Sequence, residues 1–478
     1  YSYRFSLIIF NKFLFLHMNK FVCLLLTLLN APLIFGQLDL QNKRDWPALP
    51  NSPNYYTVRE NYINYLYSLE MESGLLGMDL GADDLWTKFM RWDHIMKTRV
   101  DADGNYPKPG WLFEETTRYM NSHKAFYEEG SRSAGWEPVG TAEVPGSGGG
   151  VGRVNVILLD PVDPNILYAG SAGGGLWRSQ DLGGTWIPLT DNIPVTGIAD
   201  VAVDPSNNHV IYIATGDGYG YEASWQADND FWGGVYSAGV FKSVDNGLTW
   251  LPTGLSYLQQ DLLISQRLIV HPTNTNILLA ATRDGIYRTT DGGDNWTLVE
   301  EKHCYDFAFK TTDDNTIYAV GEMDVLISTD AGENWTILKN NLFGLNDRMS
   351  IETTADNPNV IYVFGAGASI RKSSDGGTSW TSSSVPFDVN TYYGYYDNVL
   401  GVSPLDEQLL YTGGLDLARS TNSGSTWVRK SSWWNWGTSE YVHADFKGII
   451  CDPANVNTLY VCNDGGVFKS INKGESWV

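Results

Sequence analysis

From residue 136 to the end of the chain, short apolar runs alternate with polar turn sequences. Runs of about four to eight apolar or β-branched residues, bounded by Gly, Pro, Asn and Asp, are typical of strands. The first complete group has a turn at Asp160-Pro161 and apolar runs at 154–159, 166–170, 176–179 and 186–189. The same order of runs and turns returns along the chain. The pattern therefore predicts repeated sheets, each of four antiparallel strands.

A polar motif, Ser/Thr-x-Asp/Asn-x-Gly-x-x-Trp, precedes the fourth run of each group. The first copy runs from Ser179 to Trp186, and the later copies end at Trp250, Trp296, Trp335, Trp380, Trp427 and Trp477. An Asp or Asn side chain can accept the backbone N–H groups of a tight turn, and Gly supplies a positive φ. Seven equivalent turns cannot all be one active site, so we expect a structural role for Asp181, Asp245, Asp291, Asp330, Asp375, Asn422 and Asn472.

The period of the motif indicates the fold. Successive tryptophans lie 39 to 64 residues apart, which is typical of propeller blades and not of helical solenoids. The predicted fold is all-β, a seven-bladed β-propeller over 136–478 whose closed ring protects its sheet edges. The seventh group lacks a fourth strand of its own. Either the segment 136–140 supplies it, or the sequence is a fragment that continues beyond Val478.

The first 135 residues have a different pattern. Residues 1–17 precede Met18 and are expected to be upstream translation outside the fold. A basic start and an apolar run that ends near Gly36 are typical of a secretory signal peptide, which we place at 18–36. Aromatic and charged residues at helical spacing predict a helical N-terminal segment over 37–135. The protein is therefore predicted to be secreted or held at the cell surface, with no membrane span after signal cleavage.

Composition narrows the possible partners. The net charge of −23 opposes binding to nucleic acid and to anionic lipid surfaces. Of the four cysteines, Cys23 falls in the leader, and the others show no zinc-binding spacing. Asp101-Ala-Asp-Gly-Asn105 resembles the start of a calcium loop, but Leu112 stands where the bidentate acid belongs, so a solvated turn is favoured. We predict no cofactor and no metal.

One face of the predicted propeller is rich in aromatic residues. If the motif joins strands three and four, the loops between strands two and three open on the opposite face, around the central channel. Exposed aromatic rings on loops favour a recognition surface for a glycan or a protein over packing between loops. The candidate ligand-binding residues are Trp225, Trp232, Tyr393, Tyr395, Trp433, Trp434 and Trp436.

Acidic residues are expected on the same face. Asp217, Asp445 and Asp464, with His443, are the candidate catalytic set if the propeller is an enzyme. Glycoside hydrolysis needs two carboxyl groups about 5–5.5 Å apart for retention, or roughly 6.5–9.5 Å for inversion. Hydrogen bonding within the loops is the alternative role for these side chains.

The seven motifs, together with Asn165-Ile-Leu-Tyr168, Gly175-Leu-Trp-Arg178 and Gly285-Ile-Tyr-Arg288, resemble the Asp-box propeller superfamily. This superfamily includes sortilin-type domains, sialidases and xyloglucan-hydrolysing glycosidases, and the resemblance covers 136–478. The leader and the helical segment, including Phe89-Met-Arg-Trp92, resemble cargo of type IX secretion, which implies an export machinery as partner.

Two departures from the xyloglucan hydrolases affect the functional prediction. The resemblance implies a catalytic Asp where Ala172 stands, and it implies a cleft between two propellers, of which one is present here. For sialidases, no arginine triad is recognisable. We therefore expect an exported, non-catalytic module that binds a glycan or protein. The alternative is a glycoside hydrolase of the xyloglucanase type that acts on β-glucan, and a sialidase ranks below both.

Overall fold

The computed structural model describes residues 54–72, 82–98, 100–105, 115, 118–119, 122, 150, 152–191, 193, 197–219, 237–257, 263–321, 323–344, 348–365, 367–386 and 398–478. The chain divides into two compact units, Tyr1–Tyr106 and Pro107–Val478. The predicted signal peptide at 18–36 and the segment 136–140 lie outside the described residues. Within the part of the chain that is described, no helix is long and apolar enough to cross a membrane.

The first unit contains a pair of helices, α2 (Tyr55–Glu72) and α3 (Ala82–Lys97). Asn54 caps α2, because its Oδ1 accepts the N–H groups of Tyr56 at 3.0 Å and Thr57 at 3.4 Å. The helices pack through a small apolar cluster that includes Tyr62 and Phe89. Both helices lie within the segment 37–135 that the sequence predicted to be helical.

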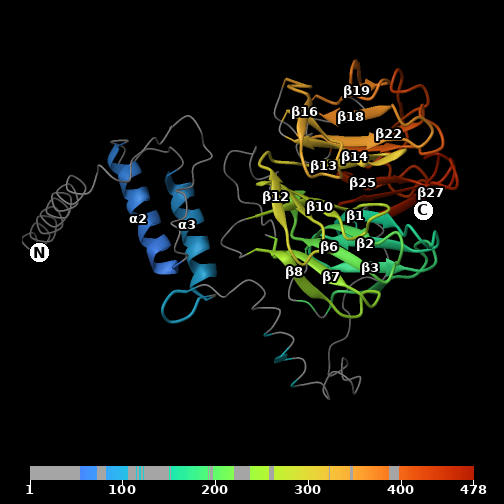
Figure 1. The fold of residues 1–478 in the computed structure, drawn as a ribbon. Coiled ribbons are helices and arrows are strands. Elements are labelled where there is room, and N and C mark those ends of the chain that lie inside the picture. The colour runs from blue at the N-terminus through green and yellow to red at the C-terminus, as the bar shows by residue number, and fades with distance from the viewer. Residues whose placement is uncertain are drawn as a thin grey trace, which may run out of the picture. The chain divides into compact units, whose positions relative to one another are not determined.

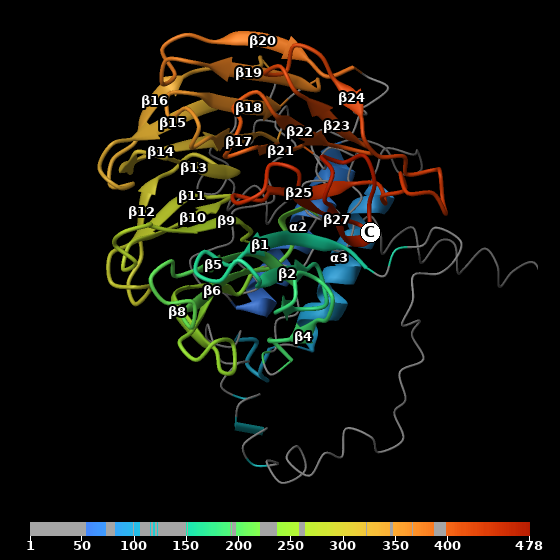
Figure 2. The same cartoon turned by 90° about the vertical axis from the view of Figure 1, so that its right-hand side faces the viewer.

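The second unit consists of seven antiparallel sheets (Figures 1 and 2). In chain order the strands are β1 (Val154–Leu159), β2 (Leu167–Ser171), β3 (Leu176–Ser179), β4 (Ile187–Pro188), β5 (Ile198–Val203), β6 (Ile211–Thr215), β7 (Gly239–Ser243), β8 (Leu251–Ser256), β9 (Ser265–Val270), β10 (Leu278–Thr282), β11 (Gly285–Thr289), β12 (Thr297–Glu300), β13 (Asp306–Lys310), β14 (Asp313–Gly321), β15 (Asp324–Ser328), β16 (Thr336–Lys339), β17 (Ser350–Thr353), β18 (Ile361–Gly365), β19 (Ser369–Ser373), β20 (Thr381–Ser384), β21 (Val399–Val402), β22 (Leu410–Gly413), β23 (Leu417–Ser420), β24 (Val428–Arg429), β25 (Phe446–Cys451), β26 (Leu459–Asn463) and β27 (Gly466–Ser470).

The sheets close into a ring. The first strand of each sheet contacts the first strand of the next, and β25 of the last sheet contacts β1 of the first. Apolar clusters fill the space between neighbouring sheets. One of them joins Tyr362 and Phe364 of β18 to Leu400 of β21 and Leu410 of β22. The predicted seven-bladed β-propeller is confirmed.

The motifs form near-identical turns between the third and fourth strands. In each, the Ser or Thr hydroxyl donates to Oδ1 of the Asp or Asn at 2.7–3.0 Å. The same Oδ1 accepts the N–H four residues later at 2.8–3.0 Å. The motif glycine has a φ of 83–102°, and the residue before it is also left-handed, at 57–71°. In four of the turns, the carbonyl group of the first left-handed residue accepts a hydrogen bond from the preceding blade.

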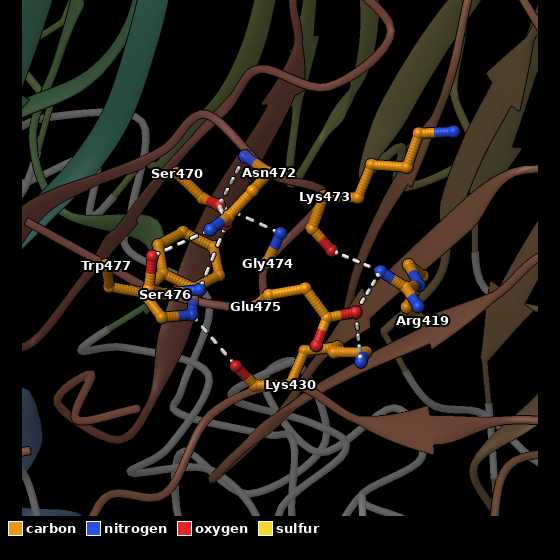
Figure 3. Close-up of polar contacts among 9 residues, drawn as sticks. All are labelled: Arg419, Lys430, Ser470, Asn472, Lys473, Gly474, Glu475, Ser476 and Trp477. Carbon is orange, nitrogen blue, oxygen red and sulfur yellow. Dashed lines mark hydrogen bonds and ion pairs between the residues drawn. The ribbon is translucent and has the colours of Figure 1, made fainter. Parts of the chain in front are cut away.

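A basic residue connects five of the seven turns to the preceding blade. The residue just before the motif is Arg or Lys in every blade except the fourth, where it is Ile327. Its side chain reaches the left-handed residue of the next turn in five contacts: Arg178 to the carbonyl of Asn246 at 3.0 Å, Lys242 to that of Gly292 at 2.9 Å, Arg288 to that of Ala331 at 2.9 Å, Lys372 to Oγ of Ser423 at 3.0 Å, and Arg419 to the carbonyl of Lys473 at 2.8 Å. Figure 3 shows the last of these clasps, where Glu475 lies between Arg419 and Lys430.

Six of the seven tryptophans that close the turns fall into two groups. Trp296, Trp335, Trp380 and Trp427 donate Nε1–H to a carbonyl of their own turn at 2.9–3.1 Å. Trp250 and Trp477 instead donate to the preceding blade, to Leu189 at 2.9 Å and Lys430 at 2.8 Å. Those carbonyls directly follow β4 and β24, which have two residues each. Where the outer strand is short, the carbonyl group that follows it thus accepts a hydrogen bond from the tryptophan of the next blade.

The last sheet has three strands, but its outer position is occupied at one point. The N–H and carbonyl of Lys469 bond to Val478 at 2.8 and 3.0 Å, in the register that joins Arg178 to Ile187 in the first blade. Pairing of 136–140 with 468–470 stays a prediction, because 136–140 lies outside the described residues. Because the main chain of Lys469 already bonds to Val478, any such pairing would have to use other residues.

The clasp of Figure 3 yields a stability prediction. Arg419→Ala is expected to lower the free energy of unfolding by about 2 kcal/mol, because a charged donor to a main-chain carbonyl is lost. Glu475→Gln should cost only about 0.5 kcal/mol, because Glu475 is half exposed. The hydrogen bond with Lys430 lowers the pKa of Glu475 below 4.5. Its small contribution is therefore complete above that pH and is lost as the pH falls. Denaturant titrations measure the free energy of unfolding of both variants. Equal losses would show that Arg419 stabilises the turn through its ion pair with Glu475 and not through its hydrogen bond to the Lys473 carbonyl.

Candidate active site

A cavity of about 370 Å³ lies between the sixth and seventh blades. It is formed by the loop between β22 and β23, the segment that follows β24, and the residues just before β25. Aromatic rings and two polar side chains line it, and its residues are Leu415, Trp433, Trp436, Tyr441, His443, Ala444 and Asp445. A partly apolar cavity with a few convergent polar groups is the usual form of a small-molecule site.

Successive turns shape the tryptophan segment, which we define as residues 433–436. The N–H of Asn435 bonds to the carbonyl of Ser432 at 3.2 Å, and that of Ser432 bonds to Glu440 at 3.0 Å. Nε1–H of Trp436 donates to the carbonyl of Trp433 at 2.8 Å. Hydrogen bonds within the segment therefore hold the rings of Trp433 and Trp436 at the cavity.

His443 and Asp445 are fixed by the strand that follows them. Phe446, fully buried, pairs with Asn463 at the start of the β25–β26 ladder. Nδ2 of Asn463 donates to the carbonyl of His443 at 2.9 Å. Asp445 has a φ of 66°, a left-handed conformation that is uncommon for a residue other than glycine and that often marks a functional site.

Asp464 directly follows β26, the strand that pairs with β25. It occupies the two-residue turn between β26 and β27, directly after Asn463, and its carboxylate is 3.8 Å from the buried ammonium of Lys447. The second turn residue must be glycine, because a Cβ at Gly465 would lie 2.4 Å from that of His443. Since Phe446 and Asn463 are Cα partners, Asp445 and Asp464 are neighbours at one end of this ladder.

Asp217 is buried and ion-paired. It is 2% exposed, pairs with Arg153, and accepts a hydrogen bond from Nδ2 of Asn155 at 3.3 Å. It does not line the cavity. Two residues later, Tyr219 donates its hydroxyl to the carbonyl of Lys447 at 2.8 Å, which joins this segment to β25. Of the candidate catalytic residues, His443 and Asp445 thus reach the cavity.

The predicted ligand-binding residues divide in a similar way. Trp433 and Trp436 line the cavity, whereas Trp434 lies beside it. Trp225, Trp232, Tyr393 and Tyr395 lie outside the described residues. Leu415 and Ala444 were missed, because a small apolar residue in a loop carries no signal of a site. The contact of Arg429 with Trp434 was also missed, because it depends on where the short strand β24 ends.

The described residues show no metal-binding group of three or more His, Cys, Asp or Glu side chains. Asp101 accepts the N–H groups of Asp103 at 2.9 Å and Asn105 at 2.8 Å, so it closes a turn as the sequence suggested.

Cys304, Cys451 and Cys462 are free thiols. Cys451 stands opposite Leu459 and Cys462 opposite Gly448, so the last two are out of register with each other.

Known proteins resemble this chain in sequence and in structure. A family model described as sortilin, neurotensin receptor 3, matches residues 174–324. A xyloglucanase of Acetivibrio thermocellus is 26% identical over 364 residues, which are 69% of this chain and 38% of the relative. A xyloglucanase of Paenibacillus sp is 26% identical over 367 residues, 70% of this chain and 32% of the relative. This chain thus spans less than two fifths of these curated relatives.

Two solved structures share the fold. A GH74 enzyme from Niastella koreensis superposes with a TM-score of 0.51 at 20% identity, covering 69% of this chain and 54% of that one. The GH74 xyloglucanase from Xanthomonas campestris gives 0.51 at 20% identity, covering 68% and 53%. The resemblance to sortilin-type and xyloglucanase-like propellers is confirmed.

The comparisons correct the functional expectation. A non-catalytic recognition module was expected because Ala172 stands where an acid was implied and because one propeller is present. The relatives that align over more than two thirds of the chain are named as xyloglucanases, so that expectation is wrong. A change at one aligned position is weak evidence against catalysis when a carboxylate can come from another loop of the same face.

Proposed function

We propose that this propeller belongs to a glycoside hydrolase that acts on a β-glucan of the xyloglucan type. One observation carries the proposal: the cavity combines Trp433, Trp436 and Tyr441 with the side chains of His443 and Asp445. Aromatic rings offer flat apolar faces that suit the faces of sugar rings. A carboxyl group beside them could act on the bond between two sugars. The names of the relatives supply the substrate class.

The proposed chemistry uses two carboxyl groups. One protonates the oxygen of the bond that breaks, and the other, as a carboxylate, activates water or attacks the sugar. We assign these roles to Asp445, on the cavity wall, and to Asp464, its neighbour on the β25–β26 ladder. His443, which lines the same cavity, is assigned an assisting role. Asp217 is left out, because it is 2% exposed and paired with Arg153, whereas the side chain of Asp464 is 26% exposed.

This chain matches 38% of the length of the xyloglucanase of Acetivibrio thermocellus. The activity of the whole relative is therefore only proposed for this chain. Export, proposed from the leader at 18–36, would bring the enzyme to polymeric glycan outside the cell. Export through a type IX machinery remains a prediction from the resemblance.

Release of reducing ends from xyloglucan by the purified chain is the direct test. The same assay on mixed-linkage β-glucan and cello-oligosaccharides shows whether the enzyme requires the branches of xyloglucan or only a β-glucan backbone. A sialylated oligosaccharide serves as the negative substrate. We expect turnover of xyloglucan that heating abolishes. Binding without turnover would contradict the proposal.

Trp436→Ala is expected to raise KM for xyloglucan oligosaccharides by about 5- to 10-fold, because one stacking face is worth about 1 kcal/mol. The kcat should change little, because the proposed role of the ring is to stack on a sugar face and not to act on the bond that breaks. Trp436 is 53% exposed, so stability should also change little. Ile337→Ala is the matched control, because Ile337 is 52% exposed on β16 and does not line the cavity. Equal kinetic effects of the two variants would remove Trp436 from the site.

A further inference from the structure

Asp416 is a buried carboxylate behind the cavity. It is 3% exposed and ends the loop between β22 and β23, next to Leu415, which lines the cavity. The same loop reaches the seventh blade, because the carbonyl of Gly414 accepts the N–H of Phe446 at 3.1 Å. The loop that ends at Asp416 thus contacts both the tryptophan segment and Phe446, the residue that follows Asp445.

Its two oxygens have distinct partners. Oδ1 accepts the main-chain N–H of Trp433 at 3.1 Å and the hydroxyl of Ser431 at 3.1 Å. Oδ2 is 3.5 Å from Nε of Arg429 on β24. Through these contacts, a single carboxylate holds both the start of the tryptophan segment and the cation beside it.

Arg429 connects Asp416 to a second aromatic ring, that of Trp434. Its guanidinium lies over the face of Trp434, 4.8 Å from the ring centroid. Trp433 and Trp434 stand at right angles, with centroids 5.8 Å apart and an interplanar angle of 88°. Trp436 is linked to the same group through the carbonyl of Trp433. All three tryptophans are therefore connected to Asp416 through contacts within one segment.

The fold by itself does not require an acid here. In the first blade, Gly175 occupies the equivalent position, and the N–H of Leu176 bonds to the Thr190 hydroxyl at 2.8 Å. That bond matches the one from Leu417 to Ser431 at 2.7 Å in the sixth blade. The hairpin closes in both blades, although only the sixth has the carboxylate. What Asp416 adds is its contact with Trp433 and, through Arg429, with Trp434.

We propose that Asp416 is the positioning residue of the sugar-binding cavity, fixing Trp433 through its main chain and Trp434 through the Arg429 guanidinium. This inference rests on the proposed function, because it takes the cavity to be the glycan site. Asp416 touches no substrate. It acts by holding aromatic faces in one arrangement, so that a sugar meets a surface already ordered.

The charge state of Asp416 gives the proposal a second readout. Burial raises its pKa to about 6, against the opposing effects of the Trp433 N–H, Arg429 and Ser431. The charged group that faces it from β24 is Arg429, and His443 and Asp445 line the adjacent cavity before β25. The ion pair is complete above pH 6 and is lost below it. Because the folded pKa exceeds 3.8, raising the pH from about 4 to about 6 lowers stability while it orders the tryptophans.

Asp416→Asn tests the inference in the full chain. The amide keeps an acceptor for the Trp433 N–H but removes the ion pair with Arg429. The near-UV circular dichroism of the wild type should change with a midpoint near pH 6, and the variant should lack that transition. We expect a dissociation constant for xyloglucan oligosaccharides about 5- to 10-fold higher at pH 7. Arg429→Lys, which keeps the charge but not the flat guanidinium, should reduce the Trp434 signal as well.

Asp324→Asn is the matched control. Asp324 occupies the same position in the fourth blade, where it accepts the N–H of Asn341 at 3.0 Å and pairs with Lys302. This variant should keep the pH transition and the affinity. An unchanged spectrum and affinity in Asp416→Asn would overturn the inference. If the wild-type chain binds no glycan, the proposed function fails, whereas the dichroism still decides whether Asp416 positions the tryptophans.

Discussion

Asp445→Asn is expected to lower kcat for xyloglucan hydrolysis by at least about 100-fold, the usual effect of removing a general acid or base. An amide is close in shape to a carboxylate, so the left-handed residue before β25 and the cavity wall should stay in place. KM should therefore change by less than about threefold. Reducing-end release at saturating substrate measures the loss, and titration calorimetry with xyloglucan oligosaccharides confirms that binding persists.

Two further variants sharpen this result. Asp464→Asn should give a loss of similar size if Asp464 is the second carboxyl group. Asp313→Asn is a control on the surface of the fourth blade, where Oδ2 of Asp313 accepts the Thr316 hydroxyl at 2.7 Å. It should keep full activity. More than a tenth of wild-type kcat in Asp445→Asn, at unchanged substrate affinity, would remove Asp445 from the proposed chemistry.

Trp250→Ala is expected to lower the free energy of unfolding by about 3–5 kcal/mol, the usual cost of deleting a large buried aromatic side chain. Trp250 is 3% exposed and belongs to the apolar cluster between the first two blades. Its indole also donates to the carbonyl of Leu189, so the variant removes packing and leaves a main-chain acceptor without its partner. Denaturant unfolding followed by far-UV circular dichroism measures the change.

Trp427→Ala provides the comparison for Trp250. Trp427 is partly exposed and bonds within its own turn, so we expect a loss about half as large. Trp250→Phe should fall between the wild type and Trp250→Ala, because it keeps a ring but loses the N–H. Equal losses for Trp250→Ala and Trp427→Ala would show that the contact between blades adds nothing to the turn itself.

The candidate site was only partly predictable. The sequence brought together Asp217, Asp445 and Asp464, because each follows or precedes a strand at the same face of the predicted ring. It did not reveal that Asp217 is neutralised by Arg153, more than sixty residues earlier in the chain. Nor did it reveal that Asp416 and Arg429 support Trp434. Both depend on side chains that meet only after the sheets have formed.

The sequence by itself determined the blades, because the interactions that define them are local. A hydroxyl bonds to an acid or amide two residues away, that side chain accepts an N–H four residues on, and a glycine permits the left-handed turn. Apolar runs of strand length between such turns leave few other folds. Tertiary structure alone decided which carbonyl each tryptophan bonds and which acid faces a cavity. These outcomes depend on the lengths of outer strands and on contacts between neighbouring blades, and no short-range pattern encodes either.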